Sequence, residues 1–88
     1  MNKQNNIRSA TAYITQTQIE HATNWIAQFK QANRYALTRN GIAAGEVIKQ
    51  YRSTTNFPIG NKAFAQMLFA CGFSRIKHNE KVTYILEK

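Results

Sequence analysis

Basic and amide side chains recur in the second half of the chain at spacings that would bring them together. Lys62, Gln66 and Phe69 are four and three residues apart, so they share one face if residues 61–71 form a helix. A lysine can donate to phosphate or to guanine, and a glutamine can form two hydrogen bonds with adenine. The remaining candidate contacts in this half of the chain are Asn61, Arg75, Lys77, His78 and Lys81. The chemistry that these residues favour is contact with a nucleic acid.

Catalytic chemistry has no comparable set of residues. The two histidines, His21 and His78, are far apart, and neither has a cysteine, histidine or carboxylate at the spacing of zinc ligands. The chain has no glycine-rich phosphate loop. Cys71 has no base near it in sequence and falls on an apolar helix face, where we expect it to be buried. We therefore predict no enzyme activity, no metal site and no cofactor.

The charge balance points to a polyanionic partner. Twelve Lys and Arg against four acidic residues give a net charge of +8 over 88 residues. Nucleic acid is the first candidate and an anionic membrane surface the second, while basicity that serves only solubility is a third interpretation. No run approaches the ~18 apolar residues of a membrane helix, and no signal peptide is evident. We therefore expect no membrane partner and a cytoplasmic location.

The helix that carries Lys62 and Gln66 is predicted by its apolar residues. Phe64, Met67, Leu68 and Cys71 recur at spacings of three and four over residues 61–71. Gly72 is suited to the left-handed position that ends a helix. Asn61 is a plausible cap at the start of this helix.

Two short strands are expected directly after this helix. Residues 75–77 and 82–86 are rich in β-branched and aromatic side chains and flank a polar turn at residues 78–81. A helix followed by a basic-tipped hairpin is typical of the recognition helix and wing of a winged-helix domain. We predict an α+β winged helix-turn-helix fold, with three helices followed by a C-terminal β-hairpin.

The first half of the chain supplies the other elements. Residues 17–20 match a capping box that would start a helix extending to about residue 35, and residues 35–38 are predicted to form a short strand paired with the hairpin. A second helix is expected from about residue 42 to residue 53, and its Gly45 would permit close helix packing. Residues 1–16 are predicted to be a mobile or extended arm, and residues 17–88 the folded domain.

The turn before the third helix and the cations of the other helices complete these predictions. Phe57 and Ile59, on either side of Pro58, are expected to be buried in the core. Lys49 and Arg52 on the second helix are predicted to add contacts to the nucleic-acid backbone. Lys30 and Arg34 carry further charge, but the sequence does not say which face of the domain they occupy.

Part of the chain also resembles a known module. The relevant residues are Val47-Ile48-Lys49-Gln50-Tyr51, Phe64, Leu68, Gly72-Phe73, Arg75 and Tyr84-Ile85-Leu86. In this order residues 46–86 resemble the C-terminal winged-helix module of poxvirus-type and phage or plasmid primase–helicases. The turn at residues 56–59 departs from that module, and this sequence has no helicase or primase domain. The resemblance implies an accessory or regulatory factor of a phage or other mobile element.

Together these observations predict a small winged-helix protein that binds double-stranded DNA. A module that binds and inhibits or recruits a protein partner is the alternative, and Phe69 on the outward helix face favours it. A binder of RNA or single strands would use the same charges, with Phe69 or Tyr84 stacking on bases. A monomer and a homodimer fit the sequence equally well.

Overall fold

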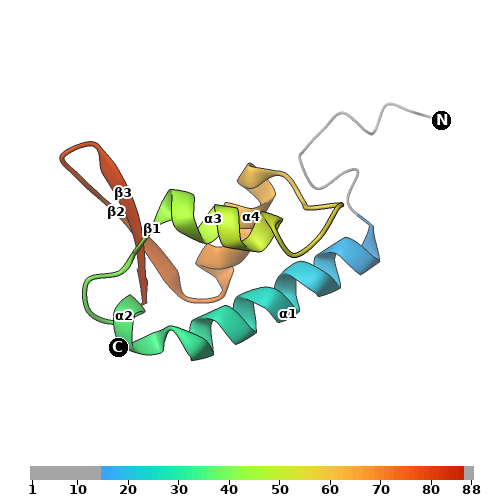
Figure 1. Cartoon of the computed structure of the whole chain (residues 1–88), viewed down its shortest axis with the longest axis horizontal. Helices are drawn as coiled ribbons and strands as arrows, with labels where there is room; N and C mark the ends of the chain where they lie inside the picture. The colour runs from blue at the N-terminus through green and yellow to red at the C-terminus, as the bar shows by residue number, and fades with distance from the viewer. Residues whose placement is uncertain (1–14, 87–88) are drawn as a thin grey trace.

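An α+β arrangement of four helices and one antiparallel sheet makes up residues 15–86, which are the residues described by this computed structural model. The elements in chain order are α1 (Gln16–Ala32), α2 (Arg34–Leu37), β1 (Ile42–Ala43), α3 (Ala44–Arg52), α4 (Asn61–Ala70), β2 (Phe73–His78) and β3 (Lys81–Leu86). Figure 1 shows α1 running along the α3–α4 pair, while the β2–β3 hairpin projects beyond the helices. The predicted α+β class is confirmed, and the arrangement is compatible with a winged helix in which α3 and α4 form the helix-turn-helix and β2–β3 the wing. The short helix α2 is additional to the three predicted helices.

The first helix begins two residues earlier than predicted. The amide of Gln18 donates to Thr15 Oγ1 at 3.1 Å, and the amide of Thr15 donates to Gln18 Oε1 at 3.0 Å, which makes Thr15 and Gln18 the capping box. The predicted box at residues 17–20 is therefore wrong. The two patterns overlap, and a tertiary contact favours the observed one because Gln18 Nε2 also donates to the carbonyl of Phe57 at 2.9 Å. The predicted arm lies outside the described residues except for Thr15 and Gln16, which start α1.

The predicted strand at residues 35–38 is also wrong. Asn33 ends α1, where its side-chain Nδ2 donates to the carbonyl of Phe29 at 3.0 Å. Residues 34–37 then form α2, a single helical turn whose Leu37 is fully buried. The hydroxyl of Thr38 donates to the carbonyl of Arg34 at 2.8 Å and closes that turn. Local hydrogen bonds therefore outweigh the β-propensity of this segment.

A short strand does pair with the wing, but it lies seven residues further on, at β1. The sheet order is β1-β3-β2, and Tyr84 on the central strand pairs with Ile42 on one side and Arg75 on the other. Gly41 precedes β1 with φ +81°, and a Cβ there would lie 2.6 Å from the carbonyl oxygen of Tyr84. Only glycine allows this close approach of the chain to β3.

The wing closes through a two-residue loop. Asn79 and Glu80 both have positive φ, at 51° and 66°, between the paired residues His78 and Lys81. Two left-handed residues in succession match the backbone twist of the flanking strands, and asparagine tolerates this region better than most residues. The predicted polar turn at residues 78–81 is confirmed.

The core lies between α1, α3, α4 and the sheet. The buried residues are Ala22, Ile26, Phe29, Leu37, Val47, Tyr51, Ile59, Ala63, Phe64, Leu68, Phe73, Tyr84 and Leu86. Tyr51 and Phe64 stack with ring centroids 4.4 Å apart at the α3–α4 contact, and Trp25 of α1 packs against both rings. The three aromatic side chains join the three long helices into one core.

The predictions for four individual residues, one of them a helix cap, are wrong or only partly right. Ile59 is buried as expected, but Phe57 is 74% exposed, because its amide and carbonyl are held by Thr55 and Gln18 in the turn. A Cβ at Gly45 would meet nothing within 4 Å, so this glycine serves no close helix contact. Gly60 rather than Asn61 is the N-cap of α4. Cys71 follows the last turn of α4 and is only partly buried.

The Tyr51 hydroxyl ties the turn before α4 to the core, and its removal should destabilise the fold. The amide of Ile59 donates to Tyr51 Oη at 3.0 Å in a buried position. Tyr51→Phe leaves that amide without an acceptor, and we expect a loss of about 1–3 kcal/mol in the free energy of unfolding. Urea denaturation measures this loss, and Tyr35→Phe at a 73% exposed position is the matched control. An equal effect of the two variants would contradict the role of this hydrogen bond.

Candidate nucleic-acid interface

The rotation of α4 about its axis decides which of its side chains are available. Phe64 and Leu68 are buried in the core, at 1% and 0% exposure, and they hold the inner face of the helix. Lys62, Gln66 and Phe69 are exposed on the outer face, as their spacing predicts. Gly72 ends the helix with φ +98°, in the left-handed region, and the chain then turns directly into β2.

The outer face of α4 forms one wall of a groove with a volume of about 370 Å³. Five residues that the sequence singled out line this groove: Asn61, Lys62, Gln66, Phe69 and Arg75. The other lining residues are Ala44, Ile48, Ala65 and Tyr84. Side chains from α3, α4 and both strands of the wing therefore meet at one concave surface.

Sequence reasoning missed the α3 wall of this groove. Ala44 and Ile48 share the apolar face of α3 with Val47 and Tyr51, and neither residue was among the predicted contacts. Only Val47 and Tyr51 are buried in the structure, while Ala44 and Ile48 are partly exposed at the edge of that face. Sequence spacing alone does not separate the centre of an apolar face from its edge.

Phe69 is the most unusual side chain of the groove. It is 46% exposed, its ring centroid lies 6.2 Å from that of Tyr84, and the guanidinium carbon of Arg75 lies 6.0 Å from its centroid. The ring is thus supported by the wing on one side and open to the groove on the other. An aromatic surface beside a guanidinium suits a flat or apolar ligand group.

The cations of the wing continue outward from the groove. Arg75 and Lys77 are two residues apart on β2, so they lie on the same face of the strand. Lys77, His78 and Lys81 are all exposed near the hairpin tip and do not line the groove. The sequence placed these residues on the wing correctly, but the fold separates them from the groove itself.

The two predicted cations of α3 behave differently from one another. Arg52 Nη1 donates to Asn61 Oδ1 at 3.4 Å, which places the guanidinium at the end of the groove where α4 begins. Lys49 is exposed and does not line the groove. Lys30 and Arg34 lie elsewhere, in a second groove between α1 and the end of α4.

Metal-ligand clusters and membrane-spanning helices are both absent from residues 15–86. In this part of the chain no three His, Cys, Asp or Glu side chains are grouped so that they could hold a metal ion. None of the helices in this part has the length and apolar character that crossing a membrane requires. Comparisons of the chain with protein-family models, curated proteins and solved structures found no match.

Proposed function

We propose that this protein is a winged-helix DNA-binding protein that places α4 in the major groove of a duplex and its wing along the phosphates. One observation supports this above the others. Five polar, basic and aromatic side chains, from α4 and β2, line one exposed groove beside a cationic hairpin. A net charge of +8 adds the long-range attraction that such binding requires.

The roles of the groove residues follow from their chemistry. Lys62 and Gln66 lie one helical turn apart on the outer face of α4, where a lysine would donate to guanine or to a phosphate and a glutamine would pair with adenine. Ala65 beside them has a small side chain that lets the helix backbone approach base edges closely. Arg75 and Lys77 would then contact phosphates, which position the protein on the duplex without reading its sequence.

Binding of a protein partner is the second candidate, and the composition of the groove supports it. Phe69, Ala44, Ile48 and Ala65 give the groove an apolar surface, and apolar surface with an aromatic at its centre is typical of protein interfaces. In this case Phe69 would be the main contact, and the lysines would contribute little.

Alanine substitutions in the groove distinguish the two functions. We expect the double substitution Lys62→Ala with Arg75→Ala to weaken duplex binding roughly 10- to 30-fold, because it removes two charge-assisted contacts. We expect Phe69→Ala to weaken it less than about threefold, since one apolar contact adds little to a charged interface. Fluorescence anisotropy with a labelled duplex at constant salt measures both changes.

Arg39→Ala is the control for the loss of one positive charge outside the groove, and it is compared with the single variants Lys62→Ala and Arg75→Ala as well as with the double variant. Arg39 is exposed, lies over the Tyr35 ring at 4.4 Å and lines neither groove. Loss of binding in the Arg39 variant equal to that in the groove variant would contradict a specific interface. Undiminished duplex binding in the groove variant, with loss of a protein complex in Phe69→Ala, would favour the second function.

The biological setting of the proposal comes from the resemblance to primase–helicase modules. An accessory or regulatory factor of a phage or other mobile element, acting on DNA in the cytoplasm, is the role that this resemblance implies. The same groove would also accept single strands or RNA through stacking on Phe69, so the anisotropy assay should include a single strand of the same sequence.

A further inference from the structure

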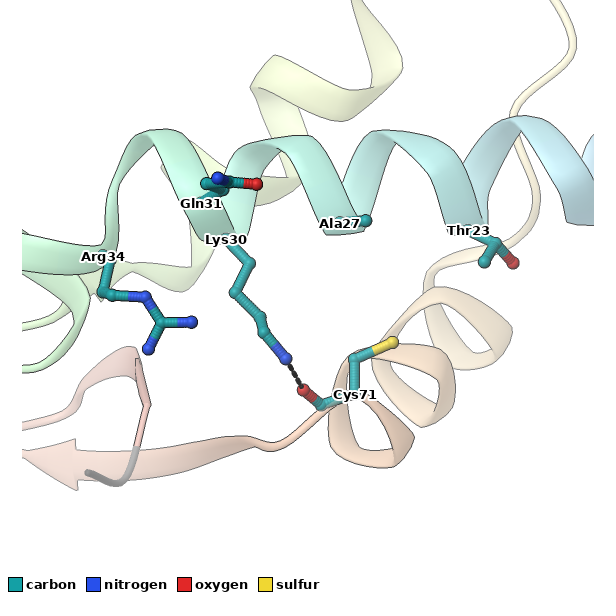
Figure 2. Close-up of a pocket in the computed structure, with 6 residues that line it drawn as sticks. All are labelled: Thr23, Ala27, Lys30, Gln31, Arg34 and Cys71. Atoms are coloured by element: carbon teal, nitrogen blue, oxygen red, sulfur yellow. Dashed lines mark hydrogen bonds between the residues drawn. The ribbon is translucent and has the colours of Figure 1, made fainter.

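A second groove lies between α1 and the C-terminal end of α4, with a volume of about 280 Å³. The residues that line it are Thr23, Ala27, Lys30, Gln31, Arg34 and Cys71. Figure 2 shows the side chains of Lys30 and Arg34 reaching from the helix side into the same gap, toward the turn that leads into β2. This groove shares no residue with the proposed interface.

The two grooves face different sides of α4. Each residue of an α-helix turns the chain by about 100°, so Cys71, nine residues after Lys62, lies roughly 180° from it around the axis. Cys71 is five residues after Gln66, so the angle between these two residues around the axis is roughly 140°. A duplex bound on the outer face of α4 therefore leaves this second groove, which we call the Lys30–Arg34 groove, open on the other side.

One of the two cations already has a structural partner. Lys30 Nζ donates to the carbonyl oxygen of Cys71 at 2.8 Å, as the dashed line in Figure 2 shows, and it neutralises the negative end of α4. An ammonium group has three donors, so this bond leaves two for a ligand. The hydrogen bond also holds the Lys30 side chain in the groove.

Arg34 is the second cation of this groove. It is exposed, and it lines the same groove as Lys30, which lies four residues earlier in the chain. Two cations that line one groove repel each other, and none of the six described residues lining it is a carboxylate that would offset the repulsion. Lys30 and Arg34 together match a phosphate group, which accepts hydrogen bonds and carries negative charge.

We propose that the Lys30–Arg34 groove binds a backbone phosphate of a second nucleic-acid segment, so that one molecule contacts two segments on different sides of α4. The identity of the ligand rests on the proposed function, but occupancy of the groove is tested separately from that of α4. The second segment can be an adjacent part of the same long duplex or a separate duplex. A short duplex cannot reach both grooves, so it tests binding of a separate duplex.

The experiment is an NMR titration of the isotope-labelled chain with a 12-base-pair duplex at low salt, continued past two equivalents. We expect the amides of residues 30–34 and Cys71 to shift in a second phase, after those of residues 61–69. Arg34→Glu should weaken this second phase at least about tenfold, because it replaces an attraction for phosphate by a repulsion. Arg39→Glu carries the same change of charge outside the groove and should leave the phase unchanged.

Each outcome supports or overturns the inference. Shifts at residues 30–34 without shifts at α4 would support the groove and sink the proposed function. Shifts at α4 alone, or equal effects of Arg34→Glu and Arg39→Glu, would overturn the groove. A parallel titration with inorganic phosphate tests the source of the ligand, since shifts with phosphate but none with duplex would assign the groove to a free anion and overturn the nucleic-acid proposal.

Discussion

Raising the salt concentration from 50 to 200 mM is expected to weaken duplex binding by this protein roughly a thousandfold. The candidate phosphate contacts are six exposed cations around α3, α4 and the wing: Lys49, Arg52, Lys62, Arg75, Lys77 and Lys81. Each phosphate contact releases a counterion, and about six contacts give a slope of about −5 in a plot of log affinity against log salt. The slope therefore measures the number of phosphate contacts.

Anisotropy titrations at four or five salt concentrations would measure this slope. Lys77→Ala should lower its magnitude by about 1, since one contact is lost. Arg39→Ala, the charge-matched control outside the groove, should leave it unchanged. A total change in affinity below about tenfold over this range would contradict an interface dominated by phosphates.

Phe64→Ala is expected to lower the free energy of unfolding by about 3–5 kcal/mol. Phe64 is 1% exposed and stacks on Tyr51, with centroids 4.4 Å apart and planes 11° apart, so its removal opens a cavity at the α3–α4 contact. A domain of this length has a total stability of roughly 4–13 kcal/mol. The expected loss is therefore a large fraction of the total stability.

Urea denaturation followed by circular dichroism measures the stability of this variant. Phe57→Ala is the control with the same chemical change, and it should alter stability by less than about 0.5 kcal/mol because Phe57 is 74% exposed. Similar losses in the two variants would contradict the assignment of Phe64 to the core. The Phe64 variant should also lose duplex binding, since it no longer fixes the rotation of α4.

The second half of the chain was predicted well because its signals are local. The apolar spacing from Phe64 to Cys71 gave α4 to within one residue, and Gly72 marked its end through its left-handed φ. The β-branched and aromatic residues of the two strands and the polar turn between them predicted the wing. Once α4 is known to bury Phe64 and Leu68, the exposure of Lys62, Gln66 and Phe69 follows from helical geometry.

The part of the chain before α4 was predicted less well because its local patterns are compatible with more than one structure. Two overlapping capping boxes start at Thr15 and Thr17, and a contact with a residue 39 positions away, from Gln18 to Phe57, accompanies the first of them. The segment around Leu37 has side chains suited to a strand, but hydrogen bonds from Thr38 close it as a helical turn. Phe57 looked like a core residue by type, yet its backbone hydrogen bonds hold it in an exposed turn.

The amino-acid sequence by itself determined the fold class, the outward face of α4 and the strong positive charge, since these depend on periodicity and composition. Only the tertiary structure decided which charges act together. It brought Arg75 to the groove of Lys62 and Gln66, and left Lys49 outside. It also placed Lys30 and Arg34 beside Cys71 in a second groove. The physical reason is that these neighbours lie on different elements, whose relative positions are set by core packing and not by spacing along the chain.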